Sequence, residues 1–207
     1  MAHSLASEPS NNVRNLTIAA LVGWFLLALI GSLLGVFDSQ PRPPVALGLF
    51  AVAPIAVFAI CYLTSVRFQE FVLSLDLRIL TMVQTWRVGG IVFLLLYGQG
   101  ALPGVFALPA GWGDIAIGIT APVVAWYWRR PFPYKTFVVW NVLGAVDLVT
   151  AVSLGVLASA SPVGVLAGDV TTRLMGQFPL SLIPTFFVPL LLIFHVISLS
   201  RVGKGVA

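Results

Sequence analysis

Six apolar runs, each about as long as a membrane-spanning helix, divide this 207-residue chain. The runs occupy residues 16–37, 45–66, 79–98, 110–128, 136–159 and 180–200. About 20 apolar residues in a helix cross roughly 30 Å of hydrocarbon. Helix is expected because open strands leave backbone groups unsatisfied in lipid, and the alternation of a membrane barrel is absent. We therefore predict an all-α, polytopic membrane helix bundle with six transmembrane helices.

The composition supports a lipid environment for this bundle. The chain is 59% hydrophobic and 9% charged, whereas a soluble domain has about 45–50% apolar and 25% charged residues. The net charge is +4, and most of the charged residues fall in the gaps between apolar runs, without a basic stripe among exposed aromatics. We therefore expect the lipid bilayer, and no nucleic acid, as a partner. The single Cys61 excludes an intrachain disulfide.

The basic residues predict the orientation. With the N-terminus in the cytoplasm, only Arg42 and Arg173 fall in outer connections, and Arg87 lies within a span. The remaining eight basic residues fall on the inner side, a strong positive-inside bias. They are Arg14, Arg67, Arg78, Arg129, Arg130, Lys135, Arg201 and Lys204. We predict a polar tail at residues 1–15, one bundle at residues 16–201, and a cytoplasmic tail at residues 202–207.

Two connections stand out. In residues 67–78, apolar side chains recur at helical spacing with Glu70 and Asp76 off that face, which indicates a short amphipathic helix in the inner interface. The alternative is an extension of the third span. Residues 99–113 carry no charge and are rich in Gly and Pro. We expect a loop there that packs into the outer interface and caps a cavity.

Polar residues inside the spans are the candidate functional residues. An Arg at a helix centre costs roughly 2.5–3.5 kcal/mol on an insertion scale, so Arg87 needs a partner within the bundle. At about 1.5 Å per residue, Arg87 and Asp147 lie at similar depths and Asp114 lies roughly 9 Å nearer the outer face than Arg87. We therefore predict an Arg87–Asp147 pair. The complete candidate set is Gln84, Arg87, Asp114, Asn141, Asp147 and His195.

Each candidate also has a purely structural interpretation. The Arg87–Asp147 pair could only fix helix register. Asp114 could stabilise the first turn of the fourth span. Asn141 could make an interhelical hydrogen bond, and His195 could be a hydrogen-bonded core histidine. Gly31 and Gly35 form a small-residue packing site, which serves contacts within one chain or in a homo-oligomer.

Three prolines predict cavity-lining or kinked helices. Pro122 lies in the fourth span, and Pro184 and Pro189 lie in the sixth. Each frees the carbonyl four residues earlier, and a freed carbonyl at membrane depth must face protein or a water-filled cavity. The expected free carbonyls belong to Gly118, Leu180 and Thr185. Kinking for packing alone is the simpler alternative.

Several site chemistries can be tested against the sequence. Ser153 and His195 differ by roughly 17 Å in expected depth, which excludes an intramembrane serine protease. One in-span histidine and one cysteine do not make a zinc site, so no metal is expected. No cofactor is required by the pattern, although His195 leaves haem with one axial histidine open. The pattern favours a non-enzymatic protein.

Four stretches resemble a family of small, uncharacterised bacterial multi-pass membrane proteins. The stretches are QTWRVGG (84–90), LPAGWGDIAIGITAP (108–122), WNVLGAVDLVTAVSLG (140–155) and IPTFFVPLLLIFHVISL (183–199). The resemblance covers the last two-thirds of the chain. It implies a location in the bacterial inner membrane and assigns no activity and no functional residue.

Three function classes remain. The first is a small transporter or permeation protein in which Arg87, Asp147 and His195 line a proton- or anion-accessible path. The second is a membrane-embedded binding or assembly subunit for haem, quinone, lipid or a partner protein. The third is an intramembrane enzyme that uses Asp114 or His195 as acid or base. The first class predicts a cavity that reaches the polar layers, and the third predicts two titratable groups at one cavity.

Overall fold

The computed structural model describes residues 11–127 and 134–203, and all regular elements within them are helical. Six helical runs are long and apolar enough to cross a membrane, which confirms the predicted all-α, six-span bundle. These runs are α1 (Asn11–Leu33), α2 (Val45–Thr64), α4–η1–α5 (Leu77–Gly98), α6 (Gly104–Tyr127), α7 (Tyr134–Leu157) and η3–α8 (Ile183–Gly203). The third run comprises α4 (Leu77–Val83), the 3-10 helix η1 (Gln84–Gly90) and α5 (Ile91–Gly98).

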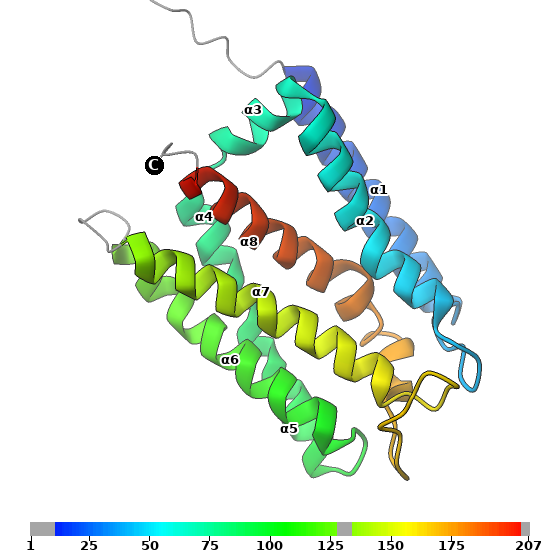
Figure 1. The fold of residues 1–207 in the computed structure, drawn as a ribbon. Coiled ribbons are helices and arrows are strands. Elements are labelled where there is room, and N and C mark those ends of the chain that lie inside the picture. Colours follow the sequence, from blue (N-terminus) through cyan, green and yellow to red (C-terminus); the bar gives the residue numbers. More distant parts are fainter. Residues whose placement is uncertain (1–10, 128–133, 204–207) are drawn as a thin grey trace, which may run out of the picture.

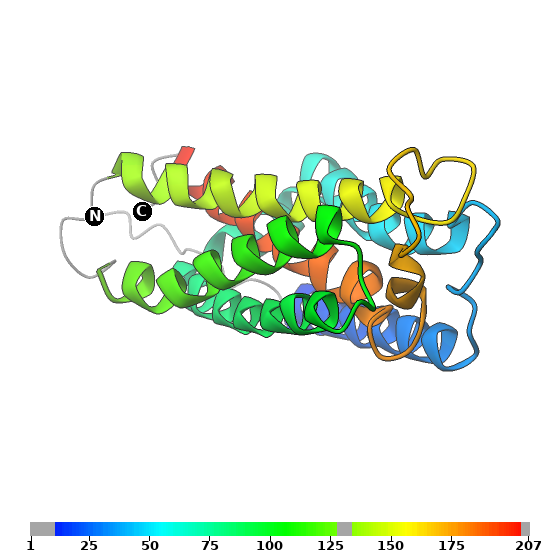
Figure 2. The ribbon, with the colours of Figure 1, turned by 90° about the horizontal axis from the view of Figure 1, so that it is seen from below.

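The six runs place their connections at two opposite ends (Figure 2). One end, which we call the terminal end, holds the start of α1, the connection from α2 to α4, and the end of α8. The opposite end, which we call the loop end, holds the α1–α2, α5–α6 and α7–η3 connections. Arg14, Arg67, Arg78, Lys135 and Arg201 all lie at the terminal end by their places in these elements. The predicted tail at residues 1–10, Arg129, Arg130 and residues 204–207 lie outside the described residues.

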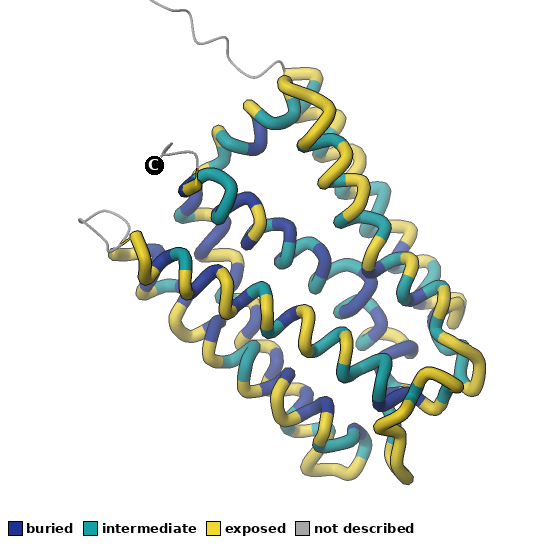
Figure 3. Tube along the Cα trace, in the orientation of Figure 1, coloured by how far each residue is buried: buried dark blue, intermediate teal, exposed yellow. Residues whose placement is uncertain are grey.

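The surface and the interior reverse the pattern of a soluble protein. Large aliphatic side chains such as Leu16, Leu63 and Val165 are more than 70% exposed. Arg87 and His195 are nearly completely buried. Figure 3 shows exposed residues along the outward faces of the spans and buried ones along the faces turned inward. This distribution suits a bundle whose outer surface is solvated by lipid.

The spans pack around α6 and α8 (Figure 1). Helix α6 packs against α4, η1, α5 and α7, while α8 packs against α7, α2 and α4. Helices α1 and α2 both contact η3 (Ile183–Phe187), a π-helix at the start of the last span. Close approach of α6 to η1 depends on Gly118, where an added Cβ would lie 2.6 Å from the Val88 nitrogen. Small residues allow such approach between membrane helices.

Helix α1 ends earlier than the apolar run that predicted it. Gly35 has a φ of 69°, and Val36 N donates to Gly31 O while Gly35 N donates to Ser32 O. This pair of bonds is a Schellman motif, which ends a helix at a glycine with positive φ. A Cβ on Gly31 would lie 3.0 Å from the Phe37 ring. The Gly31 face therefore packs against the same chain.

A separate amphipathic helix, α3 (Val66–Ser74), joins α2 to α4 at the terminal end. The Ser65 side chain accepts a hydrogen bond from Phe68 N, and Asp76 accepts one from Arg78 N at the start of α4. These two N-caps interrupt the helix between α2 and α4. Phe71 and Val72 are buried against the bundle. The amphipathic helix is therefore confirmed, and the alternative of an extended third span is wrong.

Helix α6 begins at Gly104, so the expected loop over residues 99–113 is mostly helical. Phe106 N and Ala107 N both donate to Pro103 O, which places the start of the helix directly after Pro103. Pro109 lies inside α6, where it cannot donate a helical hydrogen bond to the Val105 carbonyl. Asp114 consequently lies well inside α6, and its expected place in the first turn is wrong.

The prolines occupy different positions relative to their helices. Pro122 lies inside α6, and Pro184 stands at the beginning of η3, where no full helical turn precedes it. The Leu180 carbonyl is therefore not free, since it accepts from Ile183 N at 3.0 Å. The Thr185 carbonyl, four residues before Pro189, accepts from Trp24 Nε1 at 3.0 Å. A side chain of α1 thus contacts the irregular start of the last span.

Candidate functional site

Arg87 is the centre of a buried polar cluster. Its guanidinium donates from Nε to Asp114 Oδ1 at 2.7 Å, from Nη1 to the Gly144 carbonyl at 3.1 Å, and from Nη2 to Asp147 Oδ2. Nη1 also lies 3.3 Å from His195 Nε2. We call these five residues the Arg87 cluster. They come from η1, α6, α7 and α8, so one arginine joins four elements of the bundle.

The predicted Arg87–Asp147 pair is present, but the expected separation of Asp114 from it is wrong. Counting 1.5 Å per residue treats every span as a straight, upright α-helix. Arg87 lies in the 3-10 helix η1, which rises about 2.0 Å per residue. Its long side chain extends the reach further. The guanidinium therefore lies between both carboxylates, although their depths counted along the chain differ.

His195 connects the cluster to the next polar layer. Asn141 Nδ2 donates to the Phe137 carbonyl at 2.9 Å, so Asn141 Oδ1 is an acceptor for His195 Nδ1 at 3.0 Å. Nδ1 then carries the hydrogen of a neutral imidazole, and Nε2 accepts from Arg87. His195 is 1% exposed. Both of its nitrogens are engaged, so axial haem ligation would require the loss of one of these contacts.

Gln84 lies outside the cluster and binds a different neighbour. Its Nε2 donates to the Leu191 carbonyl of α8 at 3.1 Å, and its side chain is buried. Gln84 and Arg87 do share a face, because residues three apart are eclipsed in a 3-10 helix. The hydrogen bond of Gln84 therefore joins η1 to α8 one turn closer to the terminal end than the contacts of Arg87 do.

Three glycines that sequence reasoning did not select create the space for the cluster. A Cβ on Gly90 would lie 2.5 Å from Asp114 Cβ, and one on Gly113 would lie 1.7 Å from Asp147 Oδ1. A Cβ on Gly144 would lie 2.4 Å from His195 Nε2. Each of the three sits within three residues of Arg87, Asp114 or Asp147 in the chain. That proximity of glycine to in-span charges was the available sequence signal.

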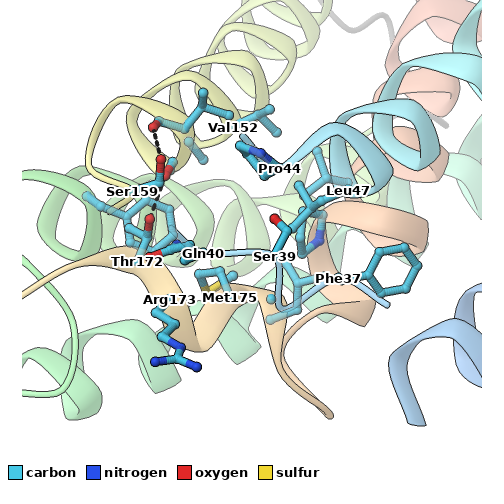
Figure 4. A pocket seen from close by; sticks show the side chains of 18 of the residues that line it. Phe37, Ser39, Gln40, Pro44, Leu47, Val152, Ser159, Thr172, Arg173 and Met175 are labelled. Carbon is cyan, nitrogen blue, oxygen red and sulfur yellow. Dashed lines mark hydrogen bonds between the residues drawn. The ribbon is translucent and has the colours of Figure 1, made fainter. Parts of the chain in front are cut away.

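A cavity of about 60 Å³ leads from the loop end to the cluster. Its wall includes Asp114 at one extreme and Asp38, Gln40 and Arg173 at the loop end. Figure 4 shows Phe37, Pro44, Leu47, Val152, Thr172 and Met175 around it. Among the described residues that line the cavity, Asp114 is the one that also belongs to the Arg87 cluster. Gln84, Asn141, Asp147 and His195 are not part of its wall.

An ion pair connects two loop segments at the mouth of this cavity. Arg173, in the 3-10 helix η2 (Thr172–Gly176), donates from Nε to Asp38 Oδ1 at 3.1 Å. Gln177 Nε2 donates to Asp38 Oδ2 at 2.9 Å. These hydrogen bonds from Arg173 and then Gln177 lower the pKa of Asp38 below its ordinary value. The Asp38 carboxylate at the cavity mouth therefore stays ionised at neutral and mildly acidic pH.

We predict that Asp38→Asn lowers thermal stability between pH 5 and 8 by the contribution of a partly exposed ion pair, about 0.2–1 kcal/mol. Because the pKa of Asp38 is lowered by folding, its contribution is present above the unfolded value near 3.9 and is lost as pH falls through the folded value. The difference in thermal unfolding between wild type and variant in detergent should begin to shrink as pH falls below about 4 and disappear only below the lowered pKa of Asp38. A constant difference down to pH 2, or an equal effect of Asp169→Asn, would contradict this account.

Comparison with known proteins identifies the family. A family model described as a domain of unknown function, DUF8737, matches residues 42–202. The chain belongs to this family. The matched segment contains the whole Arg87 cluster and excludes α1. No curated protein and no solved structure matches the chain. Membership agrees with the expected resemblance to an uncharacterised family and assigns no activity.

Proposed function

We propose that this protein is a small transport or permeation protein, and that the Arg87 cluster is its proton-binding site. The observation that carries the proposal is the cavity that runs from the loop end to Asp114. Asp114 and Asp147 both bind Arg87, so a proton that binds Asp114 changes the charge balance of the whole cluster. An intramembrane charged group that faces a cavity is the usual mark of an ion or proton pathway.

The charges of the cluster favour a proton or cation over an anion. One guanidinium faces two carboxylates, and the hydrogen bonds of His195 are those of a neutral imidazole. With both carboxylates ionised, the cluster has one excess negative charge in a region of low dielectric. An unpaired buried charge is costly, so the cluster is stabilised by one additional positive charge. Arg87 binds one oxygen of each aspartate. The second oxygen of each aspartate remains to bind the additional proton or cation.

The remainder of the pathway toward the terminal end is closed by apolar packing. One hydrophobic cluster of buried side chains lies between His195 and the terminal end. It includes Phe71, Leu80, Trp140 and Ile197 and is formed by α3, α4, α6, α7 and α8. Opening this end requires the spans to shift. The 3-10 helix η1 and the π-helix η3 are the irregular segments within spans, and such segments often mark hinges or functional sites.

The proposed location is the bacterial inner membrane, with the terminal end in the cytoplasm. The basic residues gathered at the terminal end support this orientation. The cavity mouth, with Asp38 and Arg173, would then face outward. Protons would enter the cluster from the outside, which is the direction favoured by a membrane potential that is negative inside.

We expect protein in liposomes to conduct protons when a potential is imposed. A potassium gradient with valinomycin would set the potential, and an enclosed pH-sensitive dye would report acidification. Asp114→Asn should reduce the rate to that of protein-free liposomes, because it removes the carboxylate at the cavity. Asp169→Asn, which removes a carboxylate that does not line the cavity, is the matched control. Wild-type rates equal to protein-free liposomes at both polarities would reject the proton pathway.

A further inference from the structure

The size of the cavity restricts what can bind at the Arg87 cluster. Its volume is about 60 Å³, whereas a site for a drug-sized ligand has about 300–1,000 Å³. A single water needs about 10–15 Å³ on a comparable measure. The cavity therefore suits a few waters or one very small molecule. A large organic substrate, a quinone or a haem does not fit in the space present.

The wall of the cavity selects among small cations. Between the charged groups at its two extremes, the wall is mainly aromatic and aliphatic, with Phe37, Phe93, Phe106, Leu148 and Met175. Hard metal cations need about six oxygen ligands in place of their water shell. Among the described residues, no group of three or more His, Cys, Asp or Glu side chains could hold a metal ion. Divalent metal ions are consequently poor occupants, and the mainly apolar wall offers an alkali ion few oxygens to replace its water shell.

We infer that the cavity binds a small alkylammonium ion, whose N–H groups donate to Asp114 and whose alkyl group packs against the aromatic wall. The ammonium supplies the one positive charge that the cluster lacks, and a second oxygen of Asp114 is free of Arg87 to accept from it. An alkylated cation is weakly hydrated and gains from aromatic neighbours. This inference rests on the proposed function, since it names the substrate class of the same site.

Because the proton and the ammonium ion occupy the same carboxylate, they compete. Binding of the ammonium ion releases a proton from the cluster, and protonation releases the ammonium ion. Such competition would allow exchange of the two cations across the membrane. The charge of the cluster is the same with either ligand.

The test is the thermal unfolding of the purified full chain in detergent at pH 7, with methylammonium chloride replacing sodium chloride at constant ionic strength. A ligand that binds only the folded state raises Tm in a concentration-dependent way. We expect methylammonium to raise Tm and sodium and potassium to have no comparable effect. Tetramethylammonium, which lacks N–H donors and is larger, should also fail to raise it.

Two variants assign the effect to the cavity. Asp114→Asn removes the negative charge at the cavity while Arg87 keeps Asp147, and Ala151→Leu narrows the cavity while it leaves every charged group of the cluster in place. Both should abolish the methylammonium shift, and Asp169→Asn should preserve it. Equal shifts with sodium, or a shift that survives both variants, would overturn the inference. Proton flux without a specific methylammonium shift would reject the ammonium ligand alone, whereas a specific shift without flux would reject the proton pathway alone.

Discussion

Arg87→Leu should strongly reduce the amount of folded protein. The substitution leaves the carboxylates of Asp114 and Asp147 in the bundle interior without their shared cation. Removal of one partner from a buried ion pair costs about 3–5 kcal/mol, and here two carboxylates lose the same partner. Arg87 is also the side chain that links η1 to α6, α7 and α8. We expect this to be the most damaging single substitution among those proposed here.

The rescue pattern distinguishes a three-membered cluster from a simple pair. In Arg87→Leu with Asp147→Leu, Asp114 still lacks a partner, so recovery should be partial. Addition of Asp114→Leu should recover more, because apolar replacement of a buried ion cluster is often neutral or stabilising. Size-exclusion profiles of detergent extracts would measure the folded fraction. The control is Arg173→Leu, which breaks an ion pair whose arginine side chain is 59% exposed and should change little. A double variant as stable as the triple would mean that Asp114 does not depend on Arg87.

The second large effect is expected from alanine at glycines that face the cluster. Gly89 and Gly90 are neighbours in η1, yet a Cβ on Gly89 meets nothing within 4 Å, and one on Gly90 meets Asp114 Cβ at 2.5 Å. Gly90→Ala should therefore destabilise by about 1–3 kcal/mol through overpacking. Gly89→Ala should be neutral or stabilising by up to about 1 kcal/mol, since alanine is the better helix former.

Gly144→Ala extends this test to the contact between His195 and Arg87. The added Cβ would lie 2.4 Å from His195 Nε2 and 3.4 Å from Arg87 Nη1, so the imidazole would be displaced. We expect a loss of stability together with slower proton conduction. Gly155→Ala in the same helix is the matched control for stability alone, because its Cβ meets Phe106 at an ordinary distance of 3.6 Å although Gly155 lines the cavity. Thermal unfolding of both variants measures the difference. Equal stability of Gly144→Ala and Gly155→Ala would show that this space is not required.

The position of Asp114 shows the limit of estimating the depth of a residue by counting positions along its span. Helix length and composition place Arg87 inside a span and require a partner for it, because an isolated charge in hydrocarbon is costly. The count does not include the 3-10 segment η1 or the length of an arginine side chain. These two features bring Asp114 and Asp147 to one guanidinium. A pair was therefore predictable, and the third member was not.

The spans and the need for a buried partner for Arg87 were determined by the sequence alone, because both follow from local properties. A run of apolar residues has one stable backbone arrangement in lipid, and a charge within it must be compensated. Which carboxylates compensate Arg87, how Gly90, Gly113 and Gly144 make space for them, and where the cavity opens were decided by the tertiary structure. Those properties depend on distances between residues 27 to 108 positions apart in the chain. Only the packing of the helices sets such distances.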